Sequence, residues 1–274
     1  MSEAEPLTAN TKQSAWDRKR KEEKRAKWIE HAAAIACSAG FIWLLYENVN
    51  WEFLSSLDFK VVYTYRTALL KGLGMTLLLT LITMVLAVMI GVTLAILYRI
   101  PSRPIRAFVY VYVEVWRNTP LLVQLFWVHF ALPEITGYST PTYVSGVIAM
   151  TLQASAYLTE IARAGIDSVP KGQWEASYAL AIPRRTIWTA IVLPQAFKIM
   201  IPPLANTSIS FFKATTILSL LAVDELMTAS NNVAAYTFQP FELLTLVGIV
   251  YFVLGYIFSS LTYKLETTLK RSDR

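Results

Sequence analysis

Long apolar stretches separated by short polar segments run along most of this 274-residue sequence. The clearest stretch, 72–98, contains no charged side chain. A helix needs about 20 consecutive apolar residues to cross the hydrocarbon core of a membrane. The pattern therefore predicts an all-α integral membrane protein with about six transmembrane helices, at 29–46, 67–98, 107–132, 142–169, 191–222 and 240–265.

The positions of lysine and arginine predict the orientation of these helices. Basic residues crowd the segment 1–28, the turn 99–106, the loop 168–194 and the carboxyl-terminal tail. Cytoplasmic segments of membrane proteins carry such an excess of basic residues, so both termini are expected in the cytoplasm. The net charge of +6 is therefore interpreted as a sign of topology, and no nucleic acid is expected as a partner.

Four regions follow from this scheme. A charged cytoplasmic segment, 1–28, precedes an additional helix with its external connection, 29–66. A five-helix core, 67–266, then leads into a short cytoplasmic tail, 267–274. The first helix is short and contains polar residues, so an amphipathic helix lying on the membrane surface is an alternative. The stretch 223–239 is acidic and lacks lysine and arginine, which predicts an external connection.

Several classes of chemistry find no support in the sequence. Cys37 is the only cysteine, and the two histidines, His31 and His129, are far apart in the chain and lack ligand neighbours. The chain has no glycine-rich stretch of the kind that binds the phosphates of ATP. We therefore expect no metal, no cofactor and no catalytic site in this chain.

Polar residues nevertheless interrupt the predicted helices. Two of these helices place three polar residues on one face, at spacing i, i+4, i+7: Gln153, Tyr157 and Glu160, and Asn206, Ser210 and Lys213. In the third helix, Glu114 and Arg117 are spaced to pair with each other. A charge in mid-bilayer costs about 2.5–3.5 kcal/mol, so these residues predict a polar path. For the third helix, an end that lies at the membrane surface is an equal alternative.

The polar loop 168–194 contains a recognisable motif. Its residues follow the pattern E-A-A, three residues, G, nine residues, I, one residue, L-P, through Glu175, Ala176, Ser177, Ala181, Ile191, Leu193 and Pro194. This resembles the EAA loop in the membrane subunits of bacterial ABC importers. Ser177 replaces an alanine and Ala181 replaces a glycine. Glycine would allow a left-handed turn that alanine resists by about 1 kcal/mol, and Pro183 could end the short helix instead.

Other segments resemble one branch of that family, the polar amino acid permeases. They are 114–124, 156–166, 168–173 and 213–217, and together the matches cover 68–266. The resemblance implies the permease subunit of an importer for polar amino acids, either glutamate-, glutamine- or aspartate-like or basic. It would work by alternating access in the bacterial inner membrane. The additional first helix lies outside the resemblance.

The resemblance also implies partners. These are two copies of a cytoplasmic ATPase that carries ATP and Mg²⁺, a second permease subunit (identical or homologous), an extracytoplasmic solute-binding protein and membrane lipid. The residues expected at the ATPase are Trp174, Glu175, Ala176, Ser177, Tyr178 and Ala181. Helical spacing places Trp174 and Tyr178 side by side as an exposed aromatic pair that could dock a partner; anchoring of the loop to lipid is the alternative.

A zwitterionic amino acid needs a cation for its carboxylate and an acceptor for its ammonium group. Lys213 or Arg163 could supply the cation and Glu160 the acceptor. Gln153, Tyr157, Asn206 and Ser210 would add neutral hydrogen bonds. Alternatively, Glu160 and Arg163 form an i, i+3 pair that closes an inner gate or stabilises the helix.

Two other classes of protein remain as rivals. One is a secondary transporter or channel driven by an ion gradient, against which stand the small number of helices and the motif in the loop. The other is a membrane scaffold or receptor, which the charged residues within the helices argue against.

Overall fold

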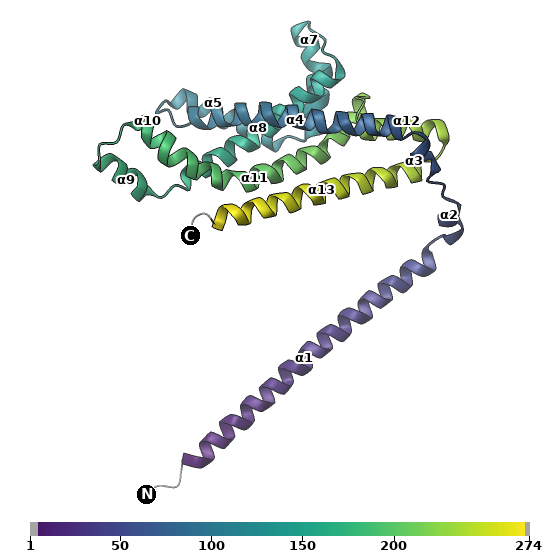
Figure 1. Ribbon diagram of the computed structural model, residues 1–274, viewed down its shortest axis with the longest axis vertical. Helices are drawn as coiled ribbons and strands as arrows, with labels where there is room; N and C mark the ends of the chain where they lie inside the picture. Colours follow the sequence, from purple (N-terminus) through teal and green to yellow (C-terminus); the bar gives the residue numbers. More distant parts are fainter. Residues whose placement is uncertain (1–4, 272–274) are drawn as a thin grey trace. The chain divides into compact units, whose positions relative to one another are not determined.

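Residues 5–271 are described by a computed structural model, and they form helices joined by short connections (Figure 1). No strand occurs among these residues, which confirms the prediction of an all-α protein. Four helical stretches are long and apolar enough to cross a membrane: Arg20–Asn48, Arg66–Leu97, Arg184–Leu221 and Pro240–Thr268. A shorter apolar stretch covers Leu121–Thr136. Six spans with both ends in the cytoplasm remain a prediction.

The chain divides into two compact units, Met1–Leu57 and Asp58–Arg274. In the first unit, the predicted charged segment and first span form one continuous helix, α1 (Glu5–Asn48), followed by the short α2 (Trp51–Ser56). The second unit begins before the predicted core boundary at 67. It does so because α3 (Lys60–Thr64) buries Val61 in the same apolar cluster as residues of the later helices.

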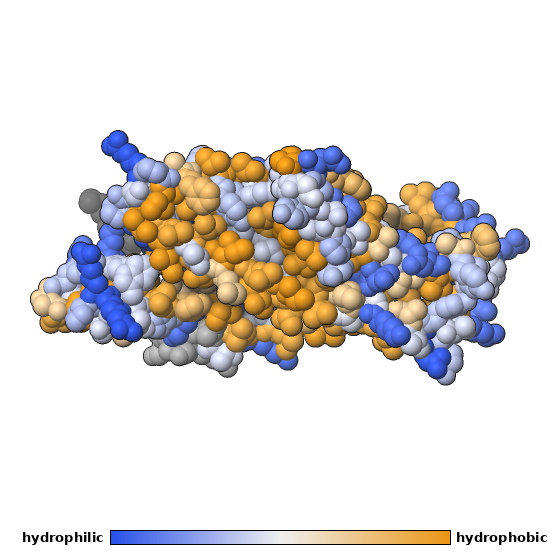
Figure 2. Space-filling view, turned by 90° about the horizontal axis from the view of Figure 1, so that it is seen from above, coloured by the Kyte–Doolittle hydropathy of each residue, from blue (hydrophilic) through white to orange (hydrophobic). Residues whose placement is uncertain are grey.

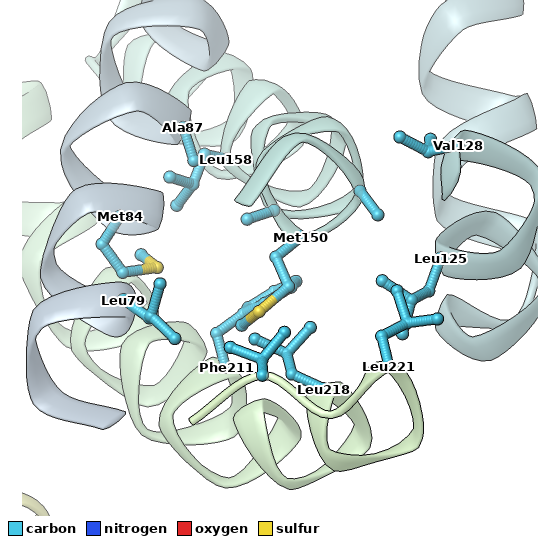
Figure 3. Packing of buried hydrophobic residues seen from close by; sticks show 13 residues of the cluster. Leu79, Met84, Ala87, Leu125, Val128, Met150, Leu158, Phe211, Leu218 and Leu221 are labelled. Atoms are coloured by element: carbon cyan, nitrogen blue, oxygen red, sulfur yellow. The ribbon is translucent and has the colours of Figure 1, made fainter. Parts of the chain in front are cut away.

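Helix α8 (Thr142–Asp167) lies at the centre of the second unit. The helices α4 (Arg66–Leu97), α5 (Arg103–Asn118) and α11 (Leu193–Ala214) pack against it. Small residues allow this close approach: a Cβ added to Gly91 of α4 would lie 2.8 Å from the Cβ of Leu158. Figure 3 shows the resulting core, where Met150 of α8 meets Phe211 of α11 and Leu218 of η3 (Thr215–Leu221).

The surface fits a membrane protein. In Figure 2, hydrophobic residues cover much of the middle of the face shown, and hydrophilic residues gather towards its ends. Lipid-facing side chains need no polar partner, whereas the ends of the helices meet water and lipid headgroups.

The third predicted helix, 107–132, is broken in two. Helix α5 ends at Asn118, and the chain resumes as α6 (Leu121–Phe126), the π-helical η1 (Trp127–Ala131) and α7 (Leu132–Thr136). Thr119 and Pro120 are extended, because proline lacks an amide hydrogen and disfavours a helical residue before it. The Gln124 side chain donates to the Trp116 and Thr119 carbonyls at 2.8 and 3.1 Å, which covers groups that the break leaves free.

The predicted external connection 223–239 is also more ordered than expected. Most of it forms α12 (Leu226–Thr237), which packs between α4 and α13 (Pro240–Arg271). Glu225 is completely buried, and its carboxylate accepts hydrogen bonds from the amides of Met227 and Thr228 at 2.9 and 2.7 Å. An acidic residue that begins a helix can satisfy the free amides there, so acidity at this position does not mean exposure.

Candidate functional site

A cavity of about 380 Å³ lies between α8 and α11. Its lining comes from Gln153 and Tyr157 of α8 and from Asn206, Thr207, Ser210, Phe211 and Ala214 of α11. The volume falls within the range of small-molecule sites. Four residues that the sequence predicted for a substrate site therefore lie together: Gln153, Tyr157, Asn206 and Ser210.

The break after α5 holds the α8 wall of this cavity. The amide of Gln153 donates to the Thr119 carbonyl at 3.0 Å, and the Tyr157 hydroxyl donates to the Arg117 carbonyl at 3.4 Å. The ring of Tyr157 also meets Phe211 edge-on, with centroids 6.4 Å apart. Carbonyls freed at a helix end need partners, so the wall side chains and the break stabilise each other.

Charged residues lie beside the cavity and outside its lining. Arg163 bonds to Glu160 at 2.6 Å, and Arg117 approaches Glu160 at 3.7 Å and Glu114 at 3.5 Å. The guanidinium of Arg163 also lies 3.8 Å from the centre of the Tyr98 ring. Each of these partly exposed pairs stabilises the fold by at most about 1 kcal/mol. Glu160 and Arg163 thus form the i, i+3 pair that the sequence allowed. Contact of either residue with substrate remains a prediction.

Lys213 points to another part of the molecule. A Cβ added to Gly255 of α13 would lie 3.2 Å from the Lys213 Cε, so this side chain lies against α13 and is not among the lining residues. The sequence reasoning missed Thr207, Phe211 and Ala214. Their spacing of i, i+4, i+7 is helical, but the face is turned by about one residue from the predicted one.

The loop 168–194 begins with a short helix, α9 (Lys171–Ala179). Ala181 ends it in the left-handed conformation, with φ of +53°. Its amide donates to the Tyr178 carbonyl at 3.0 Å, and the Ile182 amide donates to the Ser177 carbonyl at 3.1 Å. These two bonds form the Schellman arrangement that glycine usually supports. Ala181 therefore makes the turn, and Pro183 lies at the start of the next short helix, α10 (Arg184–Thr186).

Of the predicted aromatic pair on α9, Tyr178 is exposed and Trp174 is not. Tyr178 is 55% exposed. Trp174 is partly buried and meets Trp188 edge-on, with centroids 5.5 Å apart and planes at 79°. Trp188 belongs to the π-helical η2 (Ile187–Val192), which the sequence reasoning did not connect with α9. Spacing along a helix gave no sign of this contact.

The motif residues of α9 divide between surface and interior. Glu175 and Ala176 are exposed, as expected for contact with a partner. Ser177 is buried, and its hydroxyl donates to the Gln173 carbonyl at 2.6 Å.

Comparison with known proteins places the chain in a family. Residues 87–271 match the family described as "Binding-protein-dependent transport system inner membrane component". The arginine transport system permease protein ArtQ of Bacillus subtilis is 32% identical over 218 residues, which cover 80% of this chain and 100% of ArtQ. A putative glutamine transport system permease protein GlnP of Rickettsia conorii is 35% identical over 198 residues, covering 72% and 91%.

Solved structures agree with these matches. The crystal structure of an amino acid ABC transporter with histidines has a chain that is 32% identical, with a TM-score of 0.73. The match covers 78% of this chain and 99% of that one. The MetNI methionine ABC transporter in an inward-facing conformation shares the fold, with a TM-score of 0.58 at 18% identity, covering 72% of this chain and 96% of that one.

Proposed function

The chain belongs to the binding-protein-dependent transport system inner membrane components, and we propose that its substrate passes through the cavity between α8 and α11. Its relatives identify it as the permease subunit of an amino acid ABC importer. The observation that carries the proposal is a cavity of about 380 Å³ whose walls bear amide and hydroxyl groups on two central helices. Such groups can replace the hydration of a polar solute.

The walls favour an amino acid with a neutral polar side chain, such as glutamine. The lining residues carry no formal charge, and the nearby charges of Glu160 and Arg163 are paired with each other. The ammonium and carboxylate groups are common to all amino acids, and Glu160 and Arg163 beside the cavity are their proposed partners. A basic or acidic side chain would bring a further charge that loses hydration and meets no opposite charge among the lining residues. An amide side chain can exchange its bonds to water for bonds to Gln153 and Asn206.

The loop 168–194 is the proposed contact with the ATPase. Glu175, Ala176 and Tyr178 present an exposed surface on α9 for that partner. Two ATPase copies, a second permease subunit and a solute-binding protein would complete an importer in the bacterial inner membrane. ATP and Mg²⁺ would bind to the ATPase, and the permease would alternate between outward- and inward-open states.

The test is uptake into lipid vesicles that contain the permease, its ATPase and the solute-binding protein. ATP-dependent uptake of labelled glutamine is expected, with little uptake of arginine or glutamate. Asn206→Ala and Gln153→Ala should each raise the half-saturating glutamine concentration about 5- to 10-fold, because each removes a hydrogen bond in the cavity.

Thr93→Ala is a suitable control, because Thr93 lies exposed on α4 and bonds only to the Met89 carbonyl among the described residues. This variant should transport like the wild type. Uptake by the permease alone, driven by an ion gradient, would contradict the proposal and favour a secondary transporter. Preferred uptake of arginine would contradict the assignment of a neutral substrate.

A further inference from the structure

The geometry points to Trp188, which occupies an unspecified position of the loop motif, as a positioning residue that links α9 to the helix lining the cavity. The inference rests on the proposed function. The ring of Trp174 on α9 meets Trp188 edge-on at 5.5 Å. Both rings and Ile182 pack against an apolar cluster that includes Ala162 and Ile166 of α8. Movement of α9 is thus transmitted through side-chain packing as well as through the backbone of the loop.

Trp188 and the cavity lie on one helical stretch. The stretch runs from α10 through η2 into α11 and includes Pro202 and Pro203. Trp188 lies near its beginning, and Asn206 and Ser210 lie near its end. At 1.5 Å per residue, Trp188 is about 18 Å before Met200, and Asn206 is about 9 Å after it.

Met200 of α11 packs tightly against Gly165 of α8. A Cβ added to Gly165 of α8 would clash with the Met200 Cγ and lie 3.2 Å from the Ala196 carbonyl oxygen. This contact lies between Trp188 and the cavity along α11, so it can act as a fulcrum. A displacement at Trp188 then tilts α11 about Met200 and changes the distance between Asn206 and Gln153 on opposite walls.

The π-helical turns of η2 suit a joint of this kind. A π-helical segment has a wider turn than an α-helix and is frequent at functional sites. Trp188 lies on this segment, and Pro194 follows it directly in α11. A displacement of Trp188 therefore acts directly on the beginning of α11.

The experiment compares Trp188→Ala and Trp188→Phe with the wild type in vesicles holding permease, ATPase and solute-binding protein. The readout is the number of ATP molecules hydrolysed for each glutamine taken up. Loss of the edge-to-face pair should raise this number about 2- to 10-fold in Trp188→Ala. Phenylalanine keeps an aromatic edge, so Trp188→Phe should restore most of the coupling.

Trp127→Ala is the matched control, since Trp127 also lies on a π-helical segment but is 45% exposed. It should keep the wild-type ratio. An unchanged ratio in Trp188→Ala, or equal uncoupling in Trp127→Ala, would overturn the inference. If Trp188→Ala does not fold, Trp188→Leu removes the ring but keeps a large apolar side chain in the cluster, and it decides the question by the same ratio. Absence of ATP-dependent uptake in the wild type would instead contradict the proposed function.

Discussion

Replacement of Ala181 by glycine should stabilise the turn that ends α9, although it removes a methyl group. Ala181 adopts φ of +53°, where a residue with a Cβ is destabilised by about 1–2 kcal/mol. Glycine avoids that cost but loses more backbone entropy on folding, by about 0.5–1 kcal/mol. Because Ala181 is exposed, no packing is lost. The difference between these two ranges is centred on a net gain of about 0.5–1 kcal/mol.

Hydrogen exchange measures this gain at the turn itself. The amides of Ala181 and Ile182 bond to the Tyr178 and Ser177 carbonyls, so their exchange reports opening of the Schellman arrangement. A gain of about 0.5–1 kcal/mol slows exchange through local opening about 2- to 5-fold. The amides in the middle of α8 serve as an internal reference, because they lie far from the substitution.

Ala179→Gly provides a control with the same chemical change. Ala179 is exposed like Ala181, but it lies within α9 and has a helical conformation. Glycine there should destabilise the helix by about 0.5–1 kcal/mol and speed the same exchange. Faster exchange in Ala181→Gly would refute the claim that the left-handed alanine stores strain.

Two further predictions concern buried positions. Gly91→Ala should destabilise the protein by about 1–3 kcal/mol, because the new Cβ would lie 3.0 Å from the Ser155 carbonyl oxygen. Gly248→Ala is the control, because its new Cβ would meet open space and should not destabilise the protein. Thermal unfolding in detergent compares the stabilities of the two variants. Burial raises the pKa of Glu225 above its ordinary value despite hydrogen bonds from Met227 and Thr228 that lower it. Protonation of Glu225 therefore stabilises the folded protein fully below the ordinary pKa of the unfolded chain. This stabilisation is lost as the pH rises through the raised pKa of the folded protein. The melting temperature of Glu225→Gln should accordingly rise relative to that of the wild type as the pH increases from the ordinary pKa of a glutamate through the raised pKa of Glu225. A difference that stays constant with pH would contradict this.

The most apolar helix, α4, could be predicted from the sequence almost to the residue. The prediction of 67–98 compares with Arg66–Leu97 for α4. An uncharged stretch of this length has few other stable conformations in a membrane. Charged ends then limit how far the helix extends into the apolar layer.

Elements that depend on tertiary contacts were less predictable. The burial of Glu225 depends on the amides of α12, and that of Trp174 depends on Trp188 from another element. Some lining residues of the cavity could be predicted from helical spacing, and others could not, because they depend on tertiary contacts. Helical spacing brought Gln153 together with Tyr157 and Asn206 with Ser210, but the rotation of α11 that adds Thr207 depends on where α8 lies.

The polarity of α8 explains why the cavity forms at this helix. α8 is long enough to span a membrane but is not among the apolar stretches, and polar residues such as Gln153 and Thr159 are buried in it. In contact with lipid these groups would each cost free energy. The surrounding α4, α5 and α11 shield them. One of these neighbours, α11, directly follows η2, whose Trp188 meets Trp174 of α9. If the proposed function holds, movement of α11 against α8 is therefore the motion expected to open or close the polar path, with α4 and α5 packed on other sides of α8.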